Sequence, residues 1–312
     1  MTLREMYRWG MERLSSAGIE EASLDAWYLM EYVTGISRAA FLADSQREMP
    51  ENEKKWYREV VSRREKRIPL QHITGTQEFM GLEFCVNEHV LIPRQDTEVL
   101  VEAALEELKR LRESVCHTEK RTELLDMCTG SGCILLSTLH YARKEYEENP
   151  LWITGIGVDI SKEALRVAQQ NAEKLSTDVK WVESDLFEKV EGRFDMILSN
   201  PPYIPSDVIE TLQPEVREHD PRLALDGKED GLYFYRKMIE ESKAYLNPGG
   251  VLMFEIGSDQ GAAVSSYMKA CGYTRVGVKK DLAGLDRVVS GVYDSCALQN
   301  NRTENTDNLI DG

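Results

Sequence analysis

Residues 124–137 read LLDMCTGSGCILLS: a short apolar run, an acidic residue, two glycines and a second apolar run with helical spacing. A strand that turns sharply into a helix through a glycine-containing loop is typical of the first unit of an open parallel sheet. Gly130 and Gly132 let the backbone approach a ligand closely, and the helix that follows offers free N–H groups. The stretch therefore predicts an α/β fold whose ligand site is at this loop.

The chain around this loop alternates apolar strands with amphipathic helices, which is typical of βαβ units and a parallel sheet. The last two strands are expected to pair antiparallel. Strands are expected at 123–128, 152–159, 179–184, 194–200, 251–257, 274–280 and 287–293. Helices are expected at 96–113, 133–146, 162–175, 232–245 and 260–271.

Four segments follow from changes in composition along the chain. Residues 1–72 read as helical, and residues 73–94 alternate in short runs with turn glycines, which predicts a β-hairpin linker. Residues 95–297 form the α/β domain, and a polar stretch at 114–123 is expected to be a surface loop within it. The polar tail, 298–312, is expected to be disordered because it has few apolar residues to bury.

A helix expected over about 52–67 is unusually basic for this chain. It ends before a proline, whose ring disfavours a helical residue before it. Two interpretations stay open: a solvated helix face, or a docking patch for an acidic partner or for RNA. Its seven cations are Lys54, Lys55, Arg58, Arg63, Arg64, Lys66 and Arg67.

Composition and charge exclude several classes of protein. The 312 residues carry 38 − 54 = −16 formal charges, which argues against binding long stretches of nucleic acid by bulk charge. No apolar run approaches the roughly 20 residues that a membrane helix needs. The six cysteines form no CxxC pair and have no histidine at zinc spacing, so we expect no metal site. We therefore expect a reduced, cytoplasmic, monomeric protein without a membrane or stable nucleic-acid partner.

The glycine loop admits more than one interpretation. A Walker loop needs a lysine directly after Gly132, and a dinucleotide fingerprint needs a third glycine, and the sequence has neither. A looser loop of the D/E-x-G-x-G-x-G type remains, as in class I methyltransferases that bind S-adenosylmethionine. A tight strand-to-helix turn without a ligand is the alternative. The candidate cofactor residues in the loop are Cys128, Thr129, Gly130, Ser131 and Gly132.

Two further acidic residues follow expected strands. Asp159 ends the strand at 152–159, where a carboxylate can accept hydrogen bonds from both hydroxyls of a ribose. Asp185 follows the next strand, where it can hold an adenine amino group. Each residue alone can be a turn or cap residue. Together with the glycine loop they mark the carboxyl edge of the sheet, where ligands bind in open α/β folds.

The segment FDMILSNPPYIP, residues 194–205, carries the strongest chemical signal. A buried strand runs directly into Asn200, Pro201, Pro202 and Tyr203. The prolines stiffen the turn and remove two backbone donors. The Asn200 side-chain oxygen and the Pro201 carbonyl can then accept both hydrogens of one planar NH₂ group, with Tyr203 against its flat face. Such a clamp suits catalysis at an amide or exocyclic amine, because it directs the nitrogen lone pair and stabilises developing positive charge.

This series resembles the class I methyltransferases that act on planar nitrogen. The segments PLQHITGTQEFMGLEF at 69–84 and LIPRQDTEVLVE at 91–102 are similar to the hairpin and interdomain segment of the HemK/PrmC family. The resemblance covers roughly residues 1–295. It implies a seven-stranded Rossmann-like domain with one reversed strand, preceded by a helical substrate-recognition domain. It also implies methylation of the glutamine side-chain amide in the GGQ motif of peptide chain release factors.

The resemblance assigns further residues and shows two departures. Arg94 and Glu98 are candidates for the substrate pocket, or for an interdomain ion pair, and Phe79 is a pocket wall or core. Cys128 stands where the family loop has its first glycine, and a positive φ there is unfavourable for cysteine. Leu186 replaces an aromatic found in some relatives and can still cover an adenine face.

Two other functions stay open. A DNA or RNA adenine-N6 methyltransferase uses the same clamp on the adenine amine, but the net charge of −16 and the lack of an evident base-recognition domain weigh against it. A non-catalytic S-adenosylmethionine-binding protein is disfavoured by the intact NPPY sequence. The resemblance thus predicts a methyltransferase that consumes S-adenosylmethionine and releases S-adenosylhomocysteine.

Overall fold

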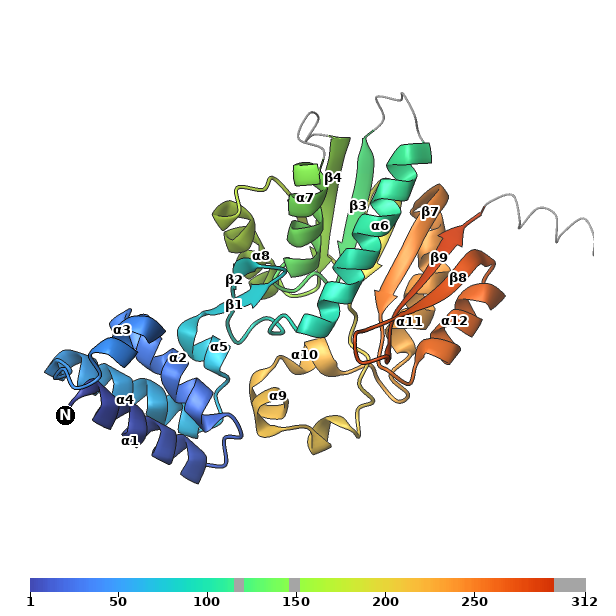
Figure 1. Ribbon diagram of the computed structural model, residues 1–312. Helices are drawn as coiled ribbons and strands as arrows, with labels where there is room; N and C mark the ends of the chain where they lie inside the picture. Colours follow the sequence, from blue (N-terminus) through green and yellow to red (C-terminus); the bar gives the residue numbers. More distant parts are fainter. Residues whose placement is uncertain (115–120, 146–151, 295–312) are drawn as a thin grey trace, which may run out of the picture. The chain divides into compact units, whose positions relative to one another are not determined.

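The computed structural model describes residues 1–114, 121–145 and 152–294 (Figure 1). The predicted disordered tail lies outside the described residues, as does most of the predicted loop at 114–123. The chain forms two compact units. The helical unit comprises Met1–Thr76, Val86–Glu88 and Leu212–His219. The sheet unit comprises Gln77–Cys85, His89–Thr211 and Asp220–Gly312.

The sheet unit is built on a sheet whose seven described strands match the seven predicted ones. Their order is β5-β4-β3-β6-β7-β9-β8. Strand β9 runs antiparallel to both of its neighbours while the other pairings are parallel, which confirms the single reversed strand. The strands are β3 (Thr122–Met127), β4 (Ile153–Asp159), β5 (Lys180–Glu183), β6 (Phe194–Ser199), β7 (Leu246–Glu255), β8 (Tyr273–Lys280) and β9 (Asp286–Tyr293).

Helices cover both faces of this sheet, because successive strand residues point to opposite faces and both faces are apolar. Leu124 belongs to one buried cluster and its neighbour Leu125 to the other. The first cluster includes side chains of α6 and α7, and the second includes side chains of α11 and α12. The helices are α6 (Glu98–Ser114), α7 (Cys133–Glu145), α8 (Lys162–Lys174), α11 (Tyr233–Glu241) and α12 (Gly261–Ala270).

The predicted hairpin is present, and a buried asparagine of α8 bonds to its second strand. Its strands are β1 (Thr76–Phe79) and β2 (Leu82–Cys85). Asn171 of α8 accepts a hydrogen bond from the Cys85 N–H at 2.6 Å and donates to the Cys85 carbonyl at 3.0 Å. Its amide also donates to the Ser131 carbonyl in the glycine loop at 2.9 Å. One fully buried side chain therefore connects the hairpin to the candidate ligand loop.

The helical unit has its own apolar core. Helix α2 ends at Gly35, whose φ of 65° is the left-handed conformation that a glycine C-cap supplies. Its helices are α1 (Leu3–Ser16), α2 (Ala22–Thr34), α3 (Arg38–Ala43), α4 (Glu51–Glu65), α5 (Leu70–Thr74) and α9 (Pro214–His219). Further short helical segments along the chain are η1 (Gln95–Thr97), η3 (Ile209–Thr211), α10 (Arg222–Leu225) and η4 (Ser242–Ala244).

The basic helix, α4 with its next two residues, is only partly a solvated face. Arg64 is 8% exposed and forms ion pairs with Asp25 at 2.6 Å and with Glu215 at 2.9 Å. Arg67 also pairs with Glu215, at 2.8 Å. These two cations therefore hold α2, α4 and α9 together inside the helical unit. Lys55, Arg58, Arg63 and Lys66 remain exposed.

We expect Arg64→Ala to lower the free energy of unfolding by about 3 kcal/mol, because it leaves the buried Asp25 carboxylate without its cation and Glu215 with Arg67 alone. The neighbouring exposed Arg63 is the matched control, and Arg63→Ala should change stability by no more than about 0.5 kcal/mol. Urea denaturation of the full chain, followed by tryptophan fluorescence, measures both. Equal effects of the two substitutions would contradict a structural role for the Arg64 ion pairs.

Candidate active site

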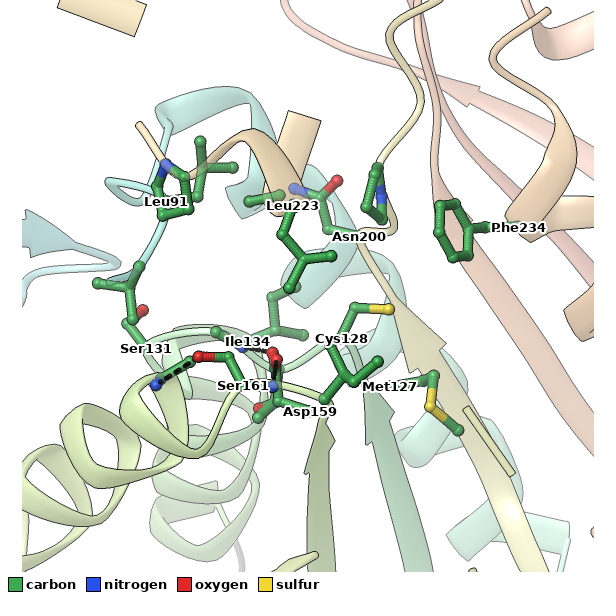
Figure 2. A pocket seen from close by; sticks show the side chains of 18 of the residues that line it. Leu91, Met127, Cys128, Ser131, Ile134, Asp159, Ser161, Asn200, Leu223 and Phe234 are labelled. Atoms are coloured by element: carbon green, nitrogen blue, oxygen red, sulfur yellow. Dashed lines mark hydrogen bonds between the residues drawn. The ribbon is translucent and has the colours of Figure 1, made fainter. Parts of the chain in front are cut away.

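A cavity of about 320 Å³ opens at the carboxyl ends of the parallel strands (Figure 2). Its size is in the range of small-molecule sites, and most of its lining is apolar with a few polar groups. In Figure 2 the side chains of Cys128, Asp159 and Asn200 surround the same space. The predicted site residues that line it are Arg94, Cys128, Thr129, Gly130, Ser131, Asp159, Asp185, Leu186, Asn200 and Pro202.

Asp126, the last acidic residue of β3, holds the glycine loop in place through a hydrogen bond. Asp126 is fully buried, and the Thr129 hydroxyl donates a hydrogen bond to its Oδ2 at 2.5 Å. Burial raises the pKa of Asp126 to about 7. The loop closes through Gly132, where φ is +79° and an added Cβ would lie 3.0 Å from the Trp181 ring. Gly132 does not line the cavity, so its contribution is to the shape of the loop.

Asp159 connects the loop with the start of α8. Its Oδ2 accepts a hydrogen bond from the Gly130 N–H and its Oδ1 from the Ser161 N–H, both at 2.9 Å. Burial raises the pKa of Asp159, and these N–H groups act in the opposite direction by favouring the carboxylate. A carboxylate has about four acceptor positions, so the side chain can still accept from a ligand in the cavity.

Three cavity residues, Lys228 among them, adopt the left-handed conformation without being glycine. Cys128 has a φ of 61° and Leu186 a φ of 46°. The positive φ anticipated as unfavourable for cysteine is thus present in the loop. Burial raises the pKa of the Cys128 thiol, so this group is a neutral thiol at pH 7. Asp185, next to Leu186, has its side chain 47% exposed, with Lys237 at 4.0 Å.

Asn200 follows β6, in the middle of the sheet. Its amide nitrogen donates to the Thr97 hydroxyl at 3.4 Å, which leaves the amide oxygen as the acceptor end. Pro201 is buried, and Pro202 lines the cavity. Tyr203 is not part of the lining, and its hydroxyl lies 3.5 Å from Glu255 Oε1.

Two residues predicted for the substrate pocket lie elsewhere in the sheet unit. Phe79 is 1% exposed and packs edge-on against Phe84 in the core. Glu98 accepts a hydrogen bond from the Met80 N–H at 2.7 Å, at the turn of the hairpin. Phe79 therefore contributes to core packing, and Glu98 anchors the hairpin. Arg94 lines the cavity and forms an ion pair with Asp220 at 2.8 Å, so it has both a structural partner and access to a ligand.

One wall of the cavity carries no signal in the sequence. This wall comes from residues 221–234, which contain no strand and only the short helix α10 before α11. Tyr233 and Phe234 pack edge-on, with ring centroids 5.1 Å apart. Neither spacing nor residue type marks them, because aromatic residues at a helix start are common in cores. Leu223 lies in the same segment, and Leu91 and Thr97 are among the further lining residues that were not predicted.

We expect Cys128→Gly to be more stable than Cys128→Ala by about 1 kcal/mol, because only glycine adopts the left-handed conformation without a steric cost. Thermal denaturation of both variants without ligand measures the difference. Position 62, on an exposed part of α4, is the control: Ser62→Gly should be less stable than Ser62→Ala by about 1 kcal/mol. The same order at both positions would show that Cys128 is not under backbone strain.

Among residues 1–114, 121–145 and 152–294, no helix is both long and apolar enough to span a bilayer. No group of three or more His, Cys, Asp or Glu side chains there is arranged to hold a metal ion.

Two family models match the chain. The model described as "PrmC N-terminal domain" matches residues 5–75, and the model described as "Methyltransferase small domain" matches residues 103–214. The catalytic domain of hMettl16, solved in complex with a 3'UTR hairpin, superposes with a TM-score of 0.52 at 16% identity. That alignment covers 72% of this chain and 81% of that one. This likeness shows the fold alone, and the predicted α/β methyltransferase fold is confirmed.

Relatives of nearly the same length match most of the sequence. A release factor glutamine methyltransferase of Geobacter sulfurreducens is 40% identical over 294 residues, which is 93% of this chain and 96% of the relative. One of Caulobacter vibrioides is 40% identical over 297 residues, covering 94% and 97%. The predicted resemblance is confirmed. The chain belongs to the release factor glutamine methyltransferase family.

Proposed function

We propose that this protein transfers a methyl group from S-adenosylmethionine to the side-chain amide of the GGQ glutamine in peptide chain release factors. The observation that carries the proposal is the position of Asn200, whose side chain reaches the cavity directly beside the glycine loop. The family supports the same reaction, since its named members are release factor glutamine methyltransferases.

The cavity residues fit S-adenosylmethionine by their chemistry. Asp159 is an acceptor for a ribose diol, and Asp185 and Leu186 are placed to contact an adenine edge and face. The loop is neutral and its Thr129, Gly130 and Gly132 N–H groups already have acceptors in the protein, which suits a ligand without a pyrophosphate. When bound, S-adenosylmethionine supplies the methyl group on a positively charged sulfonium. S-Adenosylhomocysteine is the expected product.

The clamp would act on the glutamine amide by orientation and electrostatics. Asn200 Oδ1 and the Pro201 carbonyl accept the two N–H groups, so the nitrogen lone pair faces the methyl donor. Both acceptors also stabilise the positive charge that develops on the nitrogen. Because a protonated N-methyl amide is very acidic, its proton can leave to water, and no strong general base is required.

A protein substrate offers more contacts than one side chain. A free glutamine amide brings little binding energy to offset the lost translational and rotational freedom, so a second contact is expected. The helical unit is the candidate for substrate recognition, and the exposed cations Lys55, Arg58, Arg63 and Lys66 are its candidate surface. A cytoplasmic, monomeric state without a membrane or stable nucleic-acid partner also remains a prediction.

An assay with labelled S-adenosylmethionine and intact release factor tests the function, and Asn200→Ala tests the clamp. The wild-type protein should label the release factor but not adenine-containing RNA or DNA. Asn200→Ala should lower kcat by several hundred-fold, since loss of one aligned acceptor costs roughly 2.7–4 kcal/mol at comparable sites. Labelling of nucleic acid in place of the release factor would identify the adenine alternative instead. Near-full turnover by Asn200→Ala would exclude the clamp.

Calorimetry tests the assignment of Asp159. Asp159→Ala should weaken S-adenosylmethionine and S-adenosylhomocysteine together by about 1.5–3 kcal/mol, because the ribose hydroxyls lose a charged acceptor. Asp178→Ala removes an exposed carboxylate away from the cavity and should leave both affinities unchanged. Unchanged affinities in Asp159→Ala would mean that this carboxylate only fixes the loop through Gly130 and Ser161.

A further inference from the structure

Glu255 is a buried acid that the proposed chemistry does not use. It is the last residue of β7 and is 2% exposed. Ser199 of β6 pairs with Phe254 of β7 in parallel register, so Asn200 and Glu255 follow that pair side by side. Burying a charged carboxyl group costs free energy unless hydrogen bonds or opposite charges compensate it, so the groups around Glu255 are informative.

Two hydroxyl groups lie near Glu255: that of Tyr203, the last residue of the NPPY segment (Asn200–Tyr203), and that of Thr97. The Tyr203 hydroxyl donates to Glu255 Oε1 at 3.5 Å. Glu255 Oε2 is buried without a hydrogen-bond partner among the described residues, and the nearby Thr97 hydroxyl favours the charged form of Glu255. Thr97 also accepts a hydrogen bond from Asn200 Nδ2 at 3.4 Å. Glu255 therefore contacts the last residue of the segment directly, and the Thr97 hydroxyl, which is bonded to the first residue, is the available donor for Oε2.

The direction of these hydrogen bonds decides which end of the Asn200 amide is the acceptor. A threonine hydroxyl has one hydrogen to donate, and a carboxylate is an acceptor only. While Glu255 takes that hydrogen, the Thr97 oxygen can accept from Asn200 Nδ2, so Oδ1 stays available. If Glu255 were a donor, Thr97 could donate to Asn200 Oδ1 and occupy the atom that the clamp needs.

We propose that Glu255 is a positioning residue for methyl transfer: its carboxylate accepts the Thr97 and Tyr203 hydroxyls and so keeps the Asn200 oxygen directed to the substrate amide. This inference rests on the proposed function. It assigns a role to a residue that lies outside the cavity lining and acts only through its two neighbours.

The charge state of Glu255 gives this arrangement a pH dependence. Burial raises the pKa of Glu255 to about 7, against the hydrogen bonds and the nearby Arg287, which favour the carboxylate. Asp96 raises the pKa further. Below this pKa the protonated group can donate to Thr97, which frees the Thr97 hydrogen for Asn200 Oδ1 and weakens the proposed orientation. The titratable groups that interact with Glu255 are Asp96, Cys133, Tyr203, Tyr235 and Arg287.

The backbone of the segment has separate support, so Glu255 can be changed without removing it. Gln260, at the start of α12, donates to the Tyr203 carbonyl at 3.0 Å and to the Gly231 carbonyl at 3.3 Å. Its own oxygen accepts from the Gly257 N–H at 3.0 Å. The conformation of the turn after Asn200 therefore does not depend on the charge of Glu255.

Steady-state kinetics with intact release factor test the proposal through Glu255→Gln. We expect kcat to fall about 10- to 100-fold, as for small misplacements of a catalytic group, while affinity for S-adenosylmethionine by calorimetry stays within about twofold. Glu255→Asp, which retains a carboxylate, should recover part of kcat. A loss of cofactor affinity and melting temperature in parallel with kcat would overturn the positioning role in favour of a structural one.

The pH profile separates a positioning role from general damage. Wild-type kcat should fall about tenfold per pH unit below a pKa near 7, and Glu255→Gln should be flat over the same range. Asp96→Asn is the charge control: Arg287 keeps Asp281 as its partner at 3.1 Å, so kcat above pH 8 should be unchanged. Its acidic limb should move to lower pH, because a negative charge near Glu255 is removed.

A double-mutant cycle with Thr97→Val tests the link to Asn200. Thr97→Val should lower kcat as Glu255→Gln does. The kcat of the double variant should be no lower than that of the less active single variant, because both substitutions interrupt the same proposed Glu255–Thr97–Asn200 connection. Additive losses, or a wild-type pH profile in Glu255→Gln, would overturn the proposal while leaving the methyltransferase function intact. A wild-type protein that fails to label release factor would instead overturn the proposed function, and the inference with it.

Discussion

The site depends on the parallel register of four neighbouring strands. Met127 of β3 pairs with Val158 of β4 and with Ser199 of β6, and Ser199 pairs with Phe254 of β7. The next residues along these strands are Cys128, Asp159, Asn200 and Glu255, which therefore form one row across the carboxyl edge of the sheet. A shift of one residue in any strand would turn that side chain to the other face and remove it from the row.

This row has to be polar although the strands below it are almost entirely apolar. Parallel strands covered by helices on both faces leave polar side chains only at their ends. Two acids at or near these ends accept hydrogen bonds from local donors: Asp126 Oδ2 from the Thr129 hydroxyl, and Asp159 from two backbone N–H groups. The same hydrogen bonds that make buried carboxyl groups tolerable also hold the cavity in its shape, so stability and site geometry have a common physical origin.

Much of this was predictable from local patterns. The seven strands, the hairpin and the glycine loop follow from short-range spacing and turn residues, which depend on nearest neighbours in the chain. Cys128, Asp159 and Asn200 were predicted for the site because each directly follows or ends an apolar strand. Because local patterns depend only on neighbours in the chain, the structural role of Arg64 in α4 was not predicted. Its partners Asp25 and Glu215 are 39 and 151 positions away in the sequence.

By itself, the sequence determined the α/β architecture and the carboxyl-edge location of the site, and it predicted the proposed planar-nitrogen clamp, because these depend on periodicity and on residues adjacent in the chain. Only the tertiary structure decided which of the candidates line the cavity. It placed Phe79 in the core, directed Glu98 to the hairpin, and brought Thr97 to the Asn200 amide and Tyr203 to Glu255. The physical reason is that contacts between distant segments depend on packing and strand order, which no local pattern encodes.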